Sequence, residues 1–169
     1  MKTITKISAI AILMIGFYSN SFGQASATAT ASATIITPIS IAKTVDMNFG
    51  NSAVQTGTGG TIVLTPAGGR SVTGGVTLPS VTGTVSAASF TVTGSGTSTY
   101  SITLPATCTI TSGINTMVVN TFTSTPTPTG TLAGGTETLL IGATLNISAA
   151  QAPGTYLSGT PFSVTVNYN

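Results

Sequence analysis

The chain has 169 residues but only four lysines and arginines, two aspartates and glutamates, and no histidine. Nucleic-acid binding depends on clustered Lys and Arg that displace counterions, so this composition excludes it. A metal site of the common His/Cys type is excluded as well, because the chain has one cysteine. Few charges also mean little repulsion between copies, which favours a protein that associates.

The first 23 residues have the layout of a secretory signal peptide. Lys2 and Lys6 form a basic start, a mostly apolar run covers 7–18, and the small residues Ser21 and Gly23 precede the expected cleavage site. The apolar run is shorter than the roughly 20 residues that a membrane-spanning helix needs. We therefore expect cleavage after Gly23, which leaves no integral membrane segment. The mature protein is expected to be secreted, in the periplasm or on the cell surface of a Gram-negative bacterium.

The residues after the expected cleavage site, "QASATATASATIITPISI", alternate between apolar and hydroxyl side chains. One strand of 17 residues would be about 56 Å long, too long for a small domain. We therefore expect an N-terminal extension over 24–34 and the first strand of the domain from residue 35. An unstructured low-complexity tail is the alternative. The apolar positions that would make the extension a donor strand are Ala27, Ala29, Ala31, Ala33 and Ile35.

Residues 35–169 predict an all-β domain, because apolar residues alternate, Thr, Val and Ile dominate, and Gly or Pro clusters recur at short intervals. Many short strands with such turns indicate an antiparallel sandwich. The Pro-rich stretch 126–130 is expected to be an exposed loop. The predicted strands cover about 35–49, 61–65, 71–78, 84–93, 98–104, 107–111, 116–123, 138–147 and 155–168.

The last nine residues, "PFSVTVNYN", are the most clearly amphipathic stretch of the chain. No Lys or Pro interrupts 162–169, although such residues commonly protect an exposed sheet edge from pairing with another chain. We interpret this strand as an assembly site. Its apolar residues, on every second position, are Phe162, Val164, Val166 and Tyr168.

Catalytic chemistry has little support in the sequence, and we expect no enzyme and no cofactor. The carboxylates Asp46 and Glu137 are expected to be solvated or bonded within a turn rather than to form an acid/base pair. Cys108 alternates with apolar neighbours and is expected to be a buried small residue. Tyr100 and Tyr156 follow Gly turns, where packing is a better interpretation than sugar stacking.

Several motifs resemble a known family. They are "ITPISIAKTVDMNFG", "GGVTL", "ASFTVTGSGTSTYSITLP" and the ending "LLIGATLNISAAQAPGTY…GTPFSVTVNYN". Together they are similar to the exported bacterial proteins known as domain of unknown function 4402, to spore coat protein U and, more distantly, to chaperone–usher pilins. The resemblance implies an immunoglobulin-like sandwich with a non-enzymatic surface role. Leu157 and Pro161 depart from the family pattern and predict a bulge or a split in the last strand.

The resemblance to pilins implies an assembly mechanism. Pilin-like subunits lack one strand, and the extension of the next subunit fills the gap after a periplasmic chaperone has held it. We therefore expect a pilin-like or coat-like structural subunit that pairs with copies of itself or related surface subunits through strand addition. A last strand that pairs only within its own domain is the structural alternative. The functional alternative is a secreted monomeric binding or adhesive module acting through loops such as 124–136.

Overall fold

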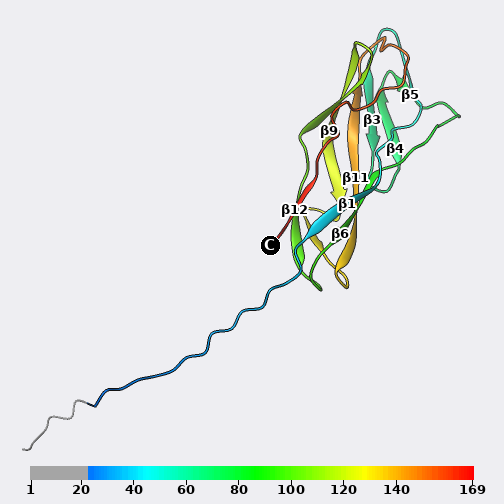
Figure 1. The fold of residues 1–169 in the computed structure, drawn as a ribbon. Helices are drawn as coiled ribbons and strands as arrows, with labels where there is room; N and C mark the ends of the chain where they lie inside the picture. The colour runs from blue at the N-terminus through cyan, green and yellow to red at the C-terminus, as the bar shows by residue number, and fades with distance from the viewer. Residues whose placement is uncertain (1–22) are drawn as a thin grey trace, which may run out of the picture. The chain divides into compact units, whose positions relative to one another are not determined.

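The structure, a computed structural model, describes residues 23–169 (Figure 1). Residues 35–169 form one compact unit. The expected signal peptide lies outside the described residues except for Gly23. Over 23–39 the chain forms neither helix nor strand. Within the described part, no helix is long and apolar enough to cross a membrane.

The compact unit is all β, as its alternating sequence predicts, and every strand pair in it is antiparallel. Its strands within the described residues are β1 (Ser40–Val45), β2 (Ala53–Val54), β3 (Gly60–Leu64), β4 (Arg70–Gly74), β5 (Val76–Thr77), β6 (Ala88–Thr93), β7 (Thr99–Thr103), β8 (Thr107–Ser112), β9 (Asn115–Thr125), β10 (Thr129–Thr131), β11 (Thr136–Ile147) and β12 (Thr165–Tyr168).

The strands form two main layers with the connectivity of an immunoglobulin-like sandwich. In the larger sheet, β1, β6, β11 and β9 lie side by side, which is the order A-B-E-D of that fold. The smaller sheet has the order β10-β7-β12, in which β7 and β12 correspond to strands C and F. The long central strand β11 also pairs with β3 along its second half. The immunoglobulin-like sandwich expected from the sequence is therefore confirmed.

Two groups of buried residues make up the core, one in each half of the domain. The group that we call the terminal cluster lies between the smaller sheet and the β1-β6-β11 strands. The insertion cluster lies where β2 to β5 have been added between β1 and β6. The terminal cluster comprises Ala88, Val92, Tyr100, Leu132, Leu139, Ile141 and Val166. The insertion cluster comprises Phe49, Ile62, Leu64, Val76, Cys108, Val119, Ala143, Leu145 and Ile147.

The prediction of an exposed loop at 126–130 is wrong for its last two residues. Residues Thr129 and Gly130 belong to β10, which pairs with β7. Gly130 is buried, and a Cβ at this position would overlap the ring of Tyr100. Leu132, just beyond the strand, is almost completely buried. Tertiary packing on Tyr100 thus overrides the loop signal of the two prolines. The loop 124–136 proposed for a binding module is largely part of the fold.

The predicted strand 155–168 is wrong over most of its length, because β12 covers only Thr165–Tyr168. Farther back, a single bridge joins Leu157 to Thr111, with hydrogen bonds of 2.8 and 3.0 Å. The predicted first strand 35–49 is also shorter, since β1 covers Ser40–Val45. The split that Leu157 and Pro161 predict in the last strand is confirmed.

Candidate functional site

The candidate site is the outer edge of β12. This strand pairs with β7 from Thr165 opposite Thr103 to Tyr168 opposite Tyr100. It ends the smaller sheet, and no other strand among residues 23–169 pairs with its second edge. In a complete immunoglobulin sandwich, strand G lies beside F at this place. The position beside β12 is therefore unfilled within the described part of the chain.

The four apolar residues predicted for the terminal strand face the core, as their alternation suggests. Val166 is buried within the terminal cluster, and Phe162, Val164 and Tyr168 are half-buried against it. The Phe162 ring also packs on Phe122, with 5.0 Å between ring centroids. Because three of the four side chains stay partly accessible, the edge of the cluster beside β12 is only partly covered.

The hydroxyl of Tyr168 fixes the end of β12. It accepts a hydrogen bond of 2.6 Å from the Ser95 backbone N–H and donates one of 2.8 Å to the Thr37 carbonyl. A Cβ on Gly94 would overlap this hydroxyl, which explains why a glycine occupies that position. Sequence reasoning identified Tyr168 but missed Thr37, Gly94 and Ser95, because nothing in the local pattern indicates these long-range partners.

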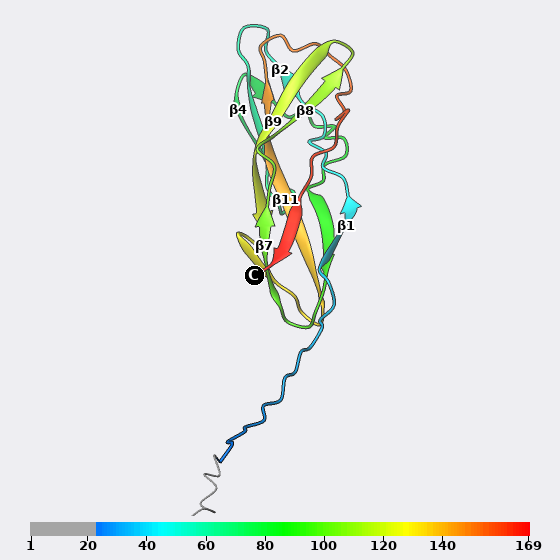
Figure 2. The same cartoon turned by 60° about the vertical axis from the view of Figure 1, so that its left-hand side comes forward.

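A second unpaired edge belongs to β1. Among residues 23–169 this strand pairs only with β6, and it ends the larger sheet. It runs opposite to β12 and contacts it (Figure 2). Ile41 and the preceding Ile39 pack against the terminal cluster. Two sheet edges therefore border the same group of buried side chains.

The residues predicted for the donor extension lie in a segment with neither helix nor strand. The side chains of Ala27, Ala29, Ala31 and Ala33 are exposed, and that of Ile35 is almost completely exposed. Their extended, unpaired backbone is compatible with a strand that pairs with another copy. Pairing with β12 itself stays a prediction.

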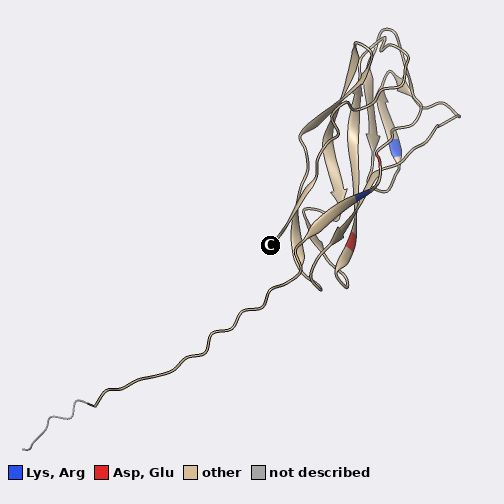
Figure 3. Ribbon diagram, in the orientation of Figure 1, with Lys and Arg blue, Asp and Glu red and all other residues tan. Residues whose placement is uncertain are grey.

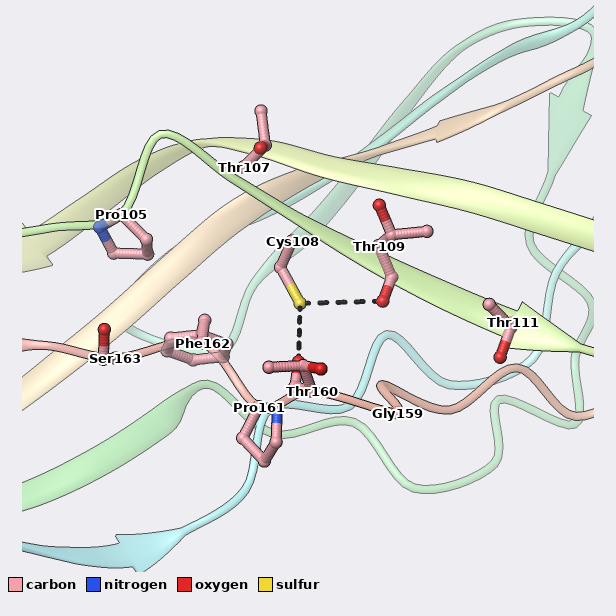
Figure 4. Close-up of a pocket in the computed structure, with 10 residues that line it drawn as sticks. All are labelled: Pro105, Thr107, Cys108, Thr109, Thr111, Gly159, Thr160, Pro161, Phe162 and Ser163. Atoms are coloured by element: carbon pink, nitrogen blue, oxygen red, sulfur yellow. Dashed lines mark hydrogen bonds between the residues drawn. The ribbon is translucent and has the colours of Figure 1, made fainter.

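On the side that faces β7 and β8, the hydrogen-bond ladder of the C-terminal segment 157–168 is interrupted. The Thr103–Thr165 and Thr111–Leu157 pairs share one register, but residues 158–164 between them form no strand. In that register Thr107 faces Pro161 and Pro105 faces Ser163, and proline has no N–H to donate. A cavity of about 540 Å³ opens there, lined by residues that include Cys108 and Phe162 (Figure 4).

Charged and nucleophilic groups do not converge on a reactive centre. Figure 3 shows the few charges spread over separate strands and loops. At the surface, Lys43 Nζ donates a hydrogen bond of 2.6 Å to Asp46 Oδ1 and forms an ion pair with it. Burial raises the pKa of the Cys108 thiol, which lowers its reactivity. Among residues 23–169, no three His, Cys, Asp or Glu side chains are grouped as metal ligands would be.

Glu137 has a structural role at the start of β11. Its Oε2 accepts hydrogen bonds of 2.8 Å from the Tyr100 hydroxyl and from the Thr131 backbone N–H. Burial raises the pKa of Tyr100, and the hydrogen bond to Glu137 and its negative charge raise it further. The turn hydrogen bond expected for Glu137 is present as the bond to Thr131, the bond to Tyr100 was not predicted, and the core packing expected for Tyr100 is confirmed. The half-buried Glu137 carboxylate thus links β7, β10 and β11.

Comparison with known proteins gives one informative match. No curated protein and no solved structure matches the chain. The sequence model of a family described as a domain of unknown function, DUF4402, matches residues 39–168, which include every strand of the domain. The chain therefore belongs to the DUF4402 family.

Proposed function

We propose that this protein is an exported, non-enzymatic subunit of a bacterial surface structure that assembles by strand complementation. Residues 24–35 of one copy add to the outer edge of β12 of the next copy. A periplasmic chaperone covers the same edge before assembly. The expected signal peptide at 1–23 supports export.

The observation that carries the proposal is the unfilled strand position beside β12. A strand placed there gains main-chain hydrogen bonds from β12, and its alternate side chains cover the terminal cluster. Three residues are available for that contact because they are only half-buried: Phe162, Val164 and Tyr168. An open edge of this kind pairs readily with other chains unless it is guarded.

Small side chains suit a donor strand that enters beside β12. Because β1 contacts β12 near this edge, we expect alanines to be accommodated there more easily than large side chains. Alanine also loses no side-chain rotamer freedom when it becomes ordered. The affinity of this donor then comes mainly from the backbone ladder, with small apolar contacts from every second residue.

Deletion of residues 24–34 tests the proposal. We expect the purified exported protein to form polymers, seen by size-exclusion chromatography and negative-stain microscopy, and the deletion to leave monomers. A matched pair of point variants tests the alternation: Ala29→Asp should prevent assembly because it places a charge against the core, whereas Thr30→Asp should leave assembly intact on the outward face. Unchanged polymers after the deletion would refute the donor role.

The alternative function, a monomeric binding or adhesive module, makes the opposite prediction. It requires a monomer at micromolar concentration both with and without residues 24–34. Its ligand surface in the 124–136 segment excludes Gly130 and Leu132, because both are buried within the fold.

A further inference from the structure

We propose a second contact between consecutive copies, in which Ile36 of the incoming copy docks on an apolar tip formed by Ile114 and Leu157 of the copy that receives its strand. This inference rests on the proposed function, because it follows the donor segment to the place where its last residues arrive. It adds a contact surface between the two copies that strand pairing alone does not require.

The first residue of this apolar tip is Ile114, whose apolar side chain is not required by the turn in which it lies. Ser112 pairs with Asn115, so Gly113 and Ile114 form a two-residue hairpin turn between β8 and β9. Gly113 has φ +59°, while Ile114 is not among the residues with positive φ, which indicates a type II′ turn. Such a turn requires glycine first but accepts a polar residue second. Ile114 is nonetheless 96% exposed.

Leu157 extends this apolar surface along the same end of the domain. It is 68% exposed, and its backbone pairs with Thr111, three residues before Ile114. At about 3.3 Å per residue along β8, Leu157 and Ile114 are therefore on the order of 10 Å apart. Residues 111–116 carry no charged side chain, so docking there removes no ion from water.

The direction of the donor strand leads it to this tip. A strand in the G position runs antiparallel to β12, as neighbouring strands of such sandwiches do. The donor therefore starts beside Tyr168 and continues toward residue 157 of the receiving copy. From Tyr168 back to Leu157 there are twelve residues, and from Ala25 to Ile36 there are also twelve.

The register that places Ala25 opposite Tyr168 satisfies the alternation as well. It sets Ala27, Ala29 and Ala31 opposite Val166, Val164 and Phe162. Directly opposed residues of antiparallel strands share a face, so these alanines meet the core. Residues 158–164 of the receiving copy form no strand, but Leu157 keeps the register of β12 toward the facing segment 103–111, so the same count brings Ile36 opposite the exposed Leu157. Ile36 is 51% exposed in the described structure and is available for this contact.

A double-mutant cycle on the polymer tests the contact. The full exported chain is prepared with Ile36→Ser, with Leu157→Ser and with both, and the dissociation rate of the polymers is measured in dilute denaturant. We expect each single variant to dissociate about tenfold faster, from the apolar area lost, and the double variant to dissociate no faster than either single one. Ile114→Asn, which suits the turn, should act like Leu157→Ser.

Val81→Asn provides the matched control, because Val81 is also a large exposed residue, at 73%, but belongs to the loop between β5 and β6. It should dissociate at the wild-type rate. Wild-type rates for the Ile36 and Leu157 variants, or effects that multiply fully in the double variant, would overturn the tip contact while leaving strand complementation intact. Polymers that still form without residues 24–34 would overturn both proposals.

Discussion

The two halves of the core differ in how their edges are covered. The insertion cluster is built around β3 and the second half of β11 and is covered by side chains of the added segments, including Val54, Val72 and Leu78. The terminal cluster uses the first half of the same strand β11 but is bordered by two unpaired edges, β1 and β12. The single strand β11 thus contributes to both halves, and the chain covers the insertion cluster but leaves the terminal cluster partly open.

The two halves therefore differ in the strands that cover them rather than in the amount of apolar sequence. Both clusters contain completely buried aliphatic residues, such as Leu64 in one and Leu139 in the other. In the part of the chain that the structure describes, the terminal cluster lacks a strand beside β12, at a position that the fold normally fills. The following variants either break this comparison or make it sharper.

The largest effect is expected from opening a cavity in either cluster. Leu64→Ala and Leu139→Ala should each lower the free energy of unfolding by about 2–5 kcal/mol, through lost burial and the cavity left behind. Urea denaturation of the monomeric protein measures both. If Leu139→Ala cost far less than Leu64→Ala, the terminal cluster would not be well packed before assembly.

Removal of the buried hydroxyl should have the next largest effect. Tyr100→Phe leaves the Glu137 carboxylate without one of its two hydrogen-bond donors and should cost about 1.5–3 kcal/mol, as bonds to charged groups do. Equilibrium unfolding at neutral pH measures the change. Tyr156→Phe, which removes a half-buried hydroxyl bonded to the Ala152 carbonyl, serves as the control with a smaller expected loss.

The same hydroxyl makes stability depend on alkaline pH. The pKa of Tyr100 is raised in the folded protein, so above its ordinary value of 10.0 the unfolded chain releases a proton that the folded chain retains. The stability that the Tyr100 hydroxyl contributes is therefore fully present below pH 10 and falls as the pH rises toward its folded-state pKa. Urea midpoints measured between pH 9 and 11.5 should fall more steeply in the wild-type protein than in Tyr100→Phe. Equal slopes would contradict the assignment.

A moderate effect is expected at the open edge. Tyr168→Phe loses the bonds to Ser95 and Thr37 but keeps the ring against the terminal cluster, and it should cost about 1 kcal/mol. Amide hydrogen exchange should show faster opening of β12 while β3 is unaffected. Uniform acceleration in both strands would mean that the edge does not open separately from the rest.

The smallest effect is expected at the surface ion pair of β1. Lys43→Ala removes a 2.6 Å contact with Asp46 in which both side chains are mostly exposed. Such pairs contribute about 0–1 kcal/mol, and salt weakens them further. Thermal unfolding at low and high salt should therefore differ little between this variant and the wild type. A larger loss would show that β1 depends on the pair for its place at the edge.

The sequence predicts much of the fold because alternation and turn residues act locally. Cys108 and the inward residues of the last strand, from Phe162 to Tyr168, occupy the buried or half-buried places that their spacing indicates. Alternation fails for the stretch before β12, where Pro161 on one side and Pro105 on the other each remove a hydrogen-bond donor from the interrupted ladder. A proline in the facing segment is invisible to a local pattern, although it breaks the pairing as effectively as one in the stretch itself.

What the sequence determines by itself is the all-β class, the inward and outward faces of the strands, and the contrast between an alanine-rich leader and a compact domain. These follow from side-chain period and from the backbone preferences of Gly, Pro and β-branched residues. Only the tertiary structure decides that β10 forms after two prolines and that Glu137 bonds Tyr100. The unfilled position beside β12, among residues 23–169, is also a property of the tertiary structure alone. All three features depend on which distant segments come into contact, and local sequence preferences do not specify such contacts.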